Sequence, residues 1–544
     1  MLAITLGALL RLWFIAHAAT ISGDTFLYGD IALSWMQHGI YGFSQSPAQP
    51  IPTLIRLPGY PLFLVLCFRL FGLEHYTPVL YLQCIIDLSA CLLLAALVRR
   101  LFGGLAALLA LSLAALCPFT ASYTAAALTE TLTGASITLA LYALERWRPK
   151  LPTTNSPTSP LERNPVLRWN SWTPWNRWAW VVSAALAASI LLRPDQGLLA
   201  VAILPAMLWL NLDASSGRPP ERIQTLGRVI LSKAKGAKSK HLRFASVPAA
   251  SLLKQILPPL AVALCTLLPL VPWTIRNART FHVFQPLAPR SAVDPGQPVP
   301  TGFYRWYRTW GLDFASTEDI YWNYDGAPIS IAELPTRAFD SSAQFTETAA
   351  LLDAYNLTAR PTPEIDARFN DIAARRIHAS APRYFVALPV ARLTNMLLRP
   401  RIEMLPISLA WWRWHEHRAQ TAFALAYAAL NLAYLVFGSL GLYRWVRRPN
   451  DPSTPIAWAM IAYIALRCAL LLTLDNSEPR YTLEFFPIFI VGIASLIHHP
   501  ESNPHGTVIL STTQSKGPAS LVCIPKISPP KSLTAGRKSF SYPS

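Results

Sequence analysis

Two carboxylates, Asp24 and Asp30, follow the first apolar segment of the chain. A carboxylate that close to hydrocarbon is costly unless it is solvated, paired or used in function. Tyr28 and Tyr41 accompany the two acids in the same polar stretch. The stretch is therefore a candidate for a site at the edge of a membrane.

Further acidic and basic residues stand in short polar segments between the later apolar runs. Carboxylates together with several fixed cations form the set of groups needed to hold a lipid phosphate beside a general base. Taken singly, each arginine is also explained as a helix side chain that extends its charged end to the membrane–water interface. The segments are residues 56–61, 129–131, 193–195, 272–277 and 475–481, which contain Arg56, Glu130, Arg193, Arg276 and Arg480.

The composition indicates a membrane protein. Only 14% of the 544 residues are charged and 52% are hydrophobic, whereas about 25% of residues are charged in an average soluble protein. The net charge of +18 does not indicate nucleic-acid binding, because the basic residues cluster between apolar runs, as the positive-inside rule expects. The seven cysteines show no metal-binding or disulfide spacing, so we expect neither metal nor cofactor.

Apolar runs predict about ten transmembrane helices. We expect the first apolar segment to be a retained helix rather than a signal peptide, since no basic segment precedes it and Arg11 interrupts it. Arg11 lies either near the cytoplasmic end of that helix or buried with a partner. The other predicted spans are residues 77–98, 104–118, 123–144, 178–192, 196–211, 255–274, 419–443, 455–474 and 484–498.

The distribution of lysine and arginine predicts the orientation. Basic loops around Arg99, Arg146, residues 150–177, residues 218–254 and Arg444 are expected inside, together with both termini. Asp24 and the other polar segments then lie outside. The apolar piece at residues 59–71 is too short to span, at about 13 residues against the ~20 required, so we expect a re-entrant or interfacial helix.

The apolar runs and the charge distribution predict four regions of the chain. Residues 1–274 form an N-terminal transmembrane module whose first outer loop covers residues 21–76. Residues 275–418 contain 16 basic and 14 acidic residues, a balance typical of a translocated soluble subdomain. Its tryptophans suit sugar stacking or an interfacial belt, and the belt is favoured for residues 411–414. Residues 419–498 hold the C-terminal transmembrane helices, and 499–544 form a basic cytoplasmic tail that we expect to be disordered.

These motifs together resemble the dolichyl-phosphate-mannose–protein mannosyltransferase-like family, glycosyltransferase family 39 and its bacterial relatives. The resembling pieces run from residue 24 to residue 481: residues 24–32 with Tyr41, 56–61, 99–103, Glu130, 192–194, 272–277 and 480–481. The resemblance implies an all-α polytopic GT-C membrane fold with an α or α/β outer subdomain. One departure is that Thr25 follows Asp24 where the family usually has a second acid.

The resemblance also implies an inverting transfer of a sugar from a polyprenyl-phosphate donor to an acceptor hydroxyl at the outer face. Asp24 would be the catalytic base. Glu130 would either orient a reacting group or serve only as a buried ion-pair partner. Asp30 would partly substitute for the acid that is missing at position 25. The leaving phosphate needs no protonation, unlike the leaving group of a glycosidase. The expected phosphate ligands are Arg56, Arg193, Arg276 and Arg480, and the expected sugar or lipid contacts are Tyr28, Tyr60, Trp273 and Tyr481.

Two other classes remain open. A transporter or flippase of lipid-linked sugars would also have about ten helices with charged residues, but such proteins often carry repeated halves, and none is visible here. A glycan polymerase or ligase at the outer face is the other alternative. We expect a multi-pass protein of the bacterial inner membrane with its site facing the periplasm. Its acceptor is a protein, lipid or glycan, and neither the sugar nor the length of the lipid carrier is specified.

Overall fold

The computed structural model describes residues 1–21, 23–45, 49–148, 176–216 and 249–497. The predicted basic loop residues of 150–175 and 218–248, and the tail from 499, lie outside these ranges. The described chain is mostly helical, as expected, and its one sheet is a two-stranded antiparallel pair, β1 (Gly42–Phe43) with β2 (Ile51–Pro52). Residues Met1–His498 form one compact unit.

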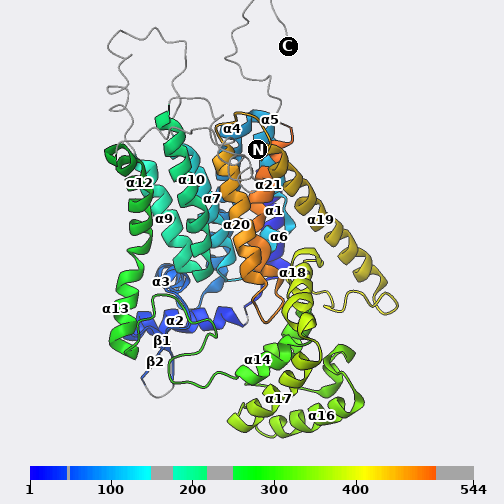
Figure 1. Ribbon diagram of the computed structural model, residues 1–544. Helices are drawn as coiled ribbons and strands as arrows, with labels where there is room; N and C mark the ends of the chain where they lie inside the picture. Colours follow the sequence, from blue (N-terminus) through cyan, green and yellow to red (C-terminus); the bar gives the residue numbers. More distant parts are fainter. Residues whose placement is uncertain (22, 46–48, 149–175, 217–248, 498–544) are drawn as a thin grey trace, which may run out of the picture. The chain divides into compact units, whose positions relative to one another are not determined.

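Most of the helices run side by side in a bundle (Figure 1). Most of the predicted apolar runs fall on these helices, but the runs at 104–118 and 255–274 are each divided by a break, and the run at 123–144 forms its α-helix only from Glu130. The bundle helices are α1 (Leu2–His17), α4 (Tyr76–Phe102), α5 (Gly104–Ala115), α6 (Pro118–Ser122), α7 (Glu130–Trp147), α9 (Arg177–Leu192), α10 (Gly197–Ser216), α12 (Ala249–Leu267), α13 (Leu270–Phe281), α19 (Arg418–Val446), α20 (Thr454–Leu471) and α21 (Phe486–Ser495).

Four described helices are long and apolar enough to cross a membrane, and there are up to six such spans if each of two bent pairs counts as one. The bent pairs are α5 with α6, at 43°, and α12 with α13, at 41°. Pro118 and Pro269 stand at the two breaks, where proline removes a backbone donor. The chain is thus an integral membrane protein, while ten spans remain a prediction.

The direction of the chain alternates from one span of the bundle to the next, with α5–α6 and α12–α13 each running in one direction (Figure 1). As a result, the starts of α7 and α10 and the ends of α9 and α20 lie at the same end of the bundle. The basic ends of α4, α7 and α19 lie at the opposite end. The polar segments therefore lie at the opposite end of the bundle from the basic residues that end α4, α7 and α19.

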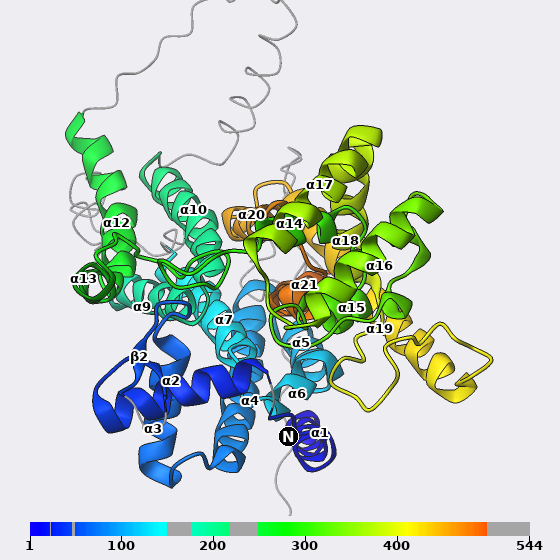
Figure 2. The ribbon, with the colours of Figure 1, turned by 90° about the horizontal axis from the view of Figure 1, so that it is seen from below.

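Two helices of the first loop lie across the polar end of the bundle: α2 (Asp24–His38) and α3 (Gly59–Phe71) (Figures 1 and 2). The helix α3 has the 13 residues expected for the short apolar piece. Its first residue, Gly59, passes so close to α9 that an added Cβ would stand 2.6 Å from the carbonyl carbon of Leu191. Only glycine fits this approach, which fixes the chain directly after Arg56 against the end of α9.

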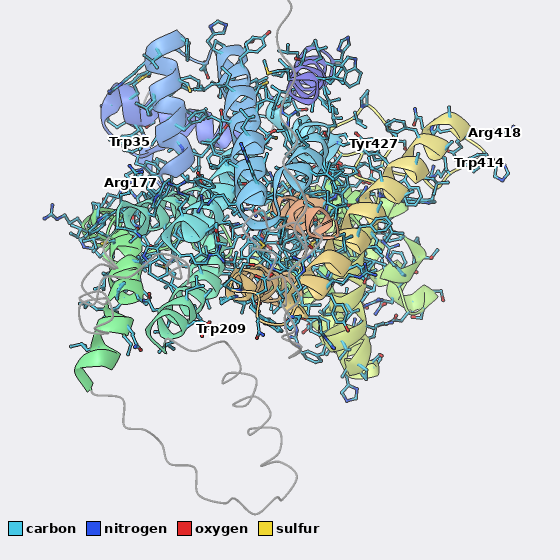
Figure 3. All side chains as sticks on the ribbon, turned by 90° about the horizontal axis from the view of Figure 1, so that it is seen from above. Trp35, Arg177, Trp209, Trp414, Arg418 and Tyr427 are labelled. Atoms are coloured by element: carbon cyan, nitrogen blue, oxygen red, sulfur yellow. The ribbon has the colours of Figure 1, made fainter. Side chains whose placement is uncertain are left out.

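Residues 301–398, all of them described, form a helical subdomain without strands. Its helices are α14 (Thr301–Arg308), α15 (Phe314–Ser316), α16 (Ser342–Asn356), α17 (Pro363–Ala379) and α18 (Leu388–Leu398). Trp306 and Trp310 are buried in its core, so they are available neither for sugar stacking nor for a belt. Trp412 and Trp414 are about half exposed, and Trp414 lies near the outer tip of α19 (Figure 3). The predicted boundary at residue 274 falls inside α13.

Arg11 is buried with a partner, the second of the two expectations. Its guanidinium pairs with Asp87 of α4 and donates to the carbonyl oxygens of Gly7, at 2.8 Å, and Ala115, at 2.7 Å. These contacts join α1, α4 and α5 inside the bundle. A charge in this place requires such a set of partners, because an unpaired cation would be strongly destabilising.

Candidate functional site

Three of the predicted site residues, Asp24, Glu130 and Arg193, stand at the ends of helices. Asp24 is the first residue of α2 and Glu130 is the first residue of α7. Carboxylates are favourable there because the unpaired N–H groups of a helix start carry partial positive charge. Gly23 enters α2 with φ of 54°, a left-handed conformation that glycine adopts readily. Arg193 follows the last residue of α9 in an extended conformation.

Asp24 is held between two arginines from distant parts of the chain. Its Oδ1 accepts a hydrogen bond from Nη2 of Arg56, and its Oδ2 accepts one from Nη2 of Arg480, each at 2.8 Å. The side chains of all three residues keep between 17% and 22% of their surface exposed. The three charges are therefore paired but remain accessible to a molecule that enters from the aqueous side.

The two arginines control the charge on Asp24. Burial alone would raise the pKa of its carboxyl group, but the charges of Arg480 and Arg56 outweigh burial and hold that pKa well below its usual range. Asp24 is thus ionised at neutral pH. While both arginines hold it, it is also a weak proton acceptor.

Glu130 and Arg193 form a second group beside this pair. Nη1 of Arg193 lies 3.3 Å from Oε1 of Glu130, and its Nη2 lies 3.1 Å from Oδ2 of Asp195. Arg480 approaches the same oxygen of Glu130 at 3.9 Å. Glu130 therefore lies between the arginine that contacts Asp24 and the arginine of the α9 turn.

The network continues into the bundle through two residues that the sequence analysis missed. Arg467 of α20 contacts Asp195 at 2.7 Å and Glu484 at 2.6 Å, and Glu484 also lies 3.3 Å from Arg193. Both side chains are almost fully buried. Both residues could have been predicted from the sequence, because each is a charged residue in an otherwise apolar run. In a membrane helix such a residue marks a functional or paired group.

Glu478 is a further acid that was not selected, although it stands two residues before Arg480. It forms an ion pair with Nε of Arg480 and is only 3% exposed. Burial raises the pKa of Glu478, and the charge of Arg480 opposes that effect. Proximity to Arg480 in sequence was the signal that could have identified it.

Two of the predicted aromatic residues, Tyr28 and Tyr481, contact the charged side chains, and a third, Tyr60, packs behind Tyr28. The guanidinium carbon of Arg56 lies 5.8 Å from the ring centre of Tyr28, which packs edge-on against Tyr60 at 5.1 Å. Tyr481 lies below Arg193 and Arg480, at 5.3 Å and 5.9 Å from their guanidinium carbons. Such contacts hold the cations in place by cation–π attraction.

Three other predicted site residues are not brought to Asp24. Asp30 accepts a hydrogen bond from the backbone N–H of Ser44 at 3.0 Å. Arg276 donates to the carbonyl oxygens of Thr53, at 2.7 Å, and Tyr41, at 2.6 Å, and lies over Trp273. These contacts join α13 to the first loop, so Arg276 and Trp273 support the loop that carries Arg56.

A small, mostly apolar cavity of about 50 Å³ lies among α4, α7 and the segment 483–490. Three carboxylates line it, those of Asp87, Glu130 and Glu484, together with Tyr123 and several threonines. The cavity thus adjoins the charged network on one side and the buried Arg11–Asp87 pair on the other. Among the described residues, no group of three or more His, Cys, Asp or Glu side chains is placed to hold a metal ion.

Comparison with solved structures gives matches of low identity. The archaeal oligosaccharyltransferase AglB from Archaeoglobus fulgidus, in complex with an inhibitory peptide and a dolichol-phosphate, matches with 12% identity and a TM-score of 0.41, over 91% of this chain and 49% of that chain. ArnT from Cupriavidus metallidurans bound to undecaprenyl phosphate matches with 13% identity and a TM-score of 0.31, over 91% and 77%. This chain spans about half the length of the archaeal protein.

No curated protein matches the sequence significantly. Residues 51–150 match the family model described as dolichyl-phosphate-mannose-protein mannosyltransferase. The matched region includes Arg56, the basic pair Arg99–Arg100 and Glu130. The resemblance of this chain to that mannosyltransferase family, predicted from motifs spread along the sequence, is therefore confirmed over residues 51–150.

Proposed function

We propose that this protein is an inverting glycosyltransferase of the GT-C class that transfers a sugar from a polyprenyl phosphate to an acceptor hydroxyl at the outer face of the membrane. The observation that carries the proposal is the position of Asp24 between Arg56 and Arg480. The family match over residues 51–150 supports the same reaction class.

The proposed reaction divides the charged residues into two roles. Asp24 takes the proton from the acceptor hydroxyl as its oxygen attacks the anomeric carbon from the side opposite the phosphate. The bond between that carbon and the phosphate oxygen breaks, and the lipid phosphate leaves as an anion. Arg56, Arg480 and Arg193 stabilise the charge on the departing phosphate, a role for donors already fixed in position.

The donor phosphate and Asp24 compete for the same arginines. When Arg56 and Arg480 turn toward the phosphate, Asp24 loses the two charges that keep its pKa low and becomes a stronger base. Donor binding would thus both neutralise the phosphate and activate the carboxylate. Tyr28 and Tyr481, which lie against the guanidinium groups of Arg56, Arg193 and Arg480, would pack on the sugar or the first isoprenoid unit. Tyr60 is fully buried and donates to Gln83, so it supports Tyr28 and does not contact a bound molecule.

Reconstituted protein in liposomes, supplied with radiolabelled polyprenyl-phosphate sugars and a panel of protein, lipid and glycan acceptors, tests the proposal. The product is expected to carry the sugar with the anomeric configuration opposite to that in the donor. Retention of configuration would contradict the single displacement at Asp24. Movement of donor lipid across the bilayer without any transfer would instead support a flippase.

A further inference from the structure

Arg480 is surrounded by three carboxylates that come from three separate segments. Nη2 contacts Asp24 of α2, and Nε contacts Glu478 of its own turn. Glu130 of α7 is more distant, at 3.9 Å from Nε. A terminal nitrogen of the guanidinium thus donates a hydrogen bond to Asp24, while Nε pairs with Glu478 by charge and without a hydrogen bond.

The environment of Glu478 sets it apart from an ordinary surface partner. Its side chain is 4% exposed, and its Oε2 is buried without a hydrogen-bond partner among the described residues. Its side chain has two partners on its own turn, the ion pair with Arg480 and a hydrogen bond with the side chain of Tyr481. A carboxylate buried to this extent is costly unless it is paired, so the contact with Arg480 is one of the two that compensate for its burial.

The backbone around Glu478 is fixed from several sides. Glu478 is extended, as expected for a residue before proline, and a 3₁₀-helix begins at Pro479. Nη1 of Arg401 donates to the carbonyl oxygen of Pro479 at 3.0 Å, and Nη2 of Arg467 donates to that of Tyr481 at 3.1 Å. Glu478 and Arg480 thus stand on a rigid turn.

The same turn is also tied to the helical subdomain. The backbone N–H of Ser477 donates to Oγ1 of Thr317 at 3.2 Å, and the Ser477 hydroxyl donates to Asn395 at 3.0 Å. Asp475 pairs with Arg308 at 3.1 Å. Glu478 is therefore held independently of α2, the helix that carries Asp24.

Thr25, the residue beside Asp24, supplies no acid to this group and is turned away from it. Its side chain is 1% exposed and donates to the carbonyl oxygen of Ala127 at 3.3 Å. A carboxylate at position 25 in the same orientation would lie against the carbonyl oxygen of Ala127, and neither group could donate a hydrogen bond to the other. The second acid closest to the Asp24–Arg480 pair comes instead from position 478.

We infer that Glu478 is a positioning residue, which holds the Nε edge of Arg480 while the terminal nitrogens move from Asp24 to the donor phosphate. This inference rests on the proposed function, because it assigns a phosphate to that place. Without Glu478, Arg480 would keep the weaker cation–π contact with Tyr481, at 5.9 Å, but would lose its ion pair on the rigid turn when it leaves Asp24. Glu130 replaces Glu478 poorly, since it lies farther from Nε and is already engaged by Arg193 at 3.3 Å.

A double-mutant cycle on lipid binding tests the inference without requiring turnover. The affinity of wild type, Glu478→Ala, Arg480→Ala and the double variant for undecaprenyl phosphate is measured in nanodiscs. Because a charge-assisted contact is lost, Glu478→Ala is expected to weaken binding about tenfold. The double variant is expected to bind no more weakly than Arg480→Ala, since Glu478 acts through Arg480. If the losses of affinity in Glu478→Ala and Arg480→Ala multiply in the double variant, the two residues act independently and the inference is overturned.

Two further variants separate positioning from folding. Glu478→Gln keeps the shape and polarity of the side chain without its charge and is expected to recover part of the affinity lost in Glu478→Ala. Glu403→Gln is the matched control, since Glu403 also has a buried oxygen without a partner but contacts the Tyr123 hydroxyl at 3.1 Å rather than Arg480. Its lipid affinity is expected to equal that of wild type. Equal losses in Glu403→Gln and Glu478→Gln would overturn the inference.

Transfer assays with the same variants distinguish this inference from the proposed function. Glu478→Ala is expected to raise KM for the donor about tenfold while KM for the acceptor stays unchanged. A change confined to the acceptor KM would contradict the positioning of Arg480 for phosphate. Wild type that binds undecaprenyl phosphate but transfers no sugar would contradict the proposed function, and the binding cycle would still decide the role of Glu478.

Discussion

Arg480 donates a 2.8 Å hydrogen bond to Asp24 across 456 residues of sequence. This single contact joins the first polar helix, α2, to the turn between α20 and α21. It means that the base assigned to Asp24 and the phosphate-binding role assigned to Arg480 cannot be filled independently. In this structure the guanidinium of Arg480 and the carboxylate of Asp24 neutralise each other.

Arg480→Ala is expected to lower kcat/KM for the donor by about 100-fold to 1,000-fold, the loss typical when one fixed donor to a developing anion is removed. Arg480→Lys is expected to recover little, because an ammonium group cannot contact Asp24 and Glu478 from two edges at once. Steady-state transfer with varied donor concentration measures both variants. Activity of Arg480→Lys close to that of wild type would show that a point charge suffices.

Stability is expected to depend on pH through Asp24. The pKa of this carboxyl is lowered in the folded protein, so its pairing stabilises the fold above the usual aspartate pKa of about 4 and loses that effect as the pH falls below it. Wild type should therefore lose more thermal stability than Asp24→Asn between about pH 5 and pH 3. Tryptophan fluorescence during thermal unfolding in detergent provides the comparison. Parallel losses in the two proteins would contradict the pairing.

Glu130→Gln is expected to reduce transfer more than it reduces stability. Arg193 retains Asp195 and Glu484 as partners, so no buried cation is left unpaired. The matched control is Glu145→Gln, a buried glutamate at the other end of α7 that pairs with Arg148 at 2.8 Å. Melting temperatures and transfer rates of both variants are compared. Equal loss of transfer in the two would assign Glu130 to structure alone.

Asp87→Ala is expected to destabilise the protein by about 3–5 kcal/mol, because it leaves Arg11 buried without its counter-ion. The double variant Arg11→Met, Asp87→Leu should recover most of that loss, since apolar residues of similar size often replace a buried ion pair without cost. Unfolding in mixed micelles measures the change. A double variant as unstable as Asp87→Ala would show that the pair has a further role.

Transfer is expected to need no metal ion, since the proposed reaction uses arginines to stabilise the phosphate. Treatment of the purified protein with EDTA should leave its rate unchanged. Lost activity that Mg²⁺ or Mn²⁺ restores would contradict this expectation.

Much of the arrangement was accessible from the sequence. Periodic apolar runs give the helices, and their alternation places residues such as Asp24, Glu130 and Arg193 at one end of the bundle. The short run at residues 59–71 is too short to cross a membrane, which identifies α3. These inferences succeed because the length of an apolar segment constrains it strongly.

Side-chain partners were much harder to predict. Arg276 had the same apparent role as Arg480, yet it binds carbonyl oxygens of the first loop. Asp87 gave no sign that it pairs with Arg11. Trp306 and Trp310 stand in a polar segment but form the core of the helical subdomain. Each of these contacts depends on tertiary packing between distant segments, which residue spacing does not encode.

The most direct test of the central claim compares Asp24→Asn with Asp30→Asn in single-turnover transfer from a saturating polyprenyl-phosphate sugar. Asp24→Asn keeps the shape of the side chain and should lower the rate by about 100-fold to 10,000-fold, the usual contribution of a general base. Asp30→Asn, which alters a contact to Ser44, should remain within a few-fold of wild type. Transfer by Asp24→Asn at the wild-type rate would contradict the assignment of Asp24 as the base.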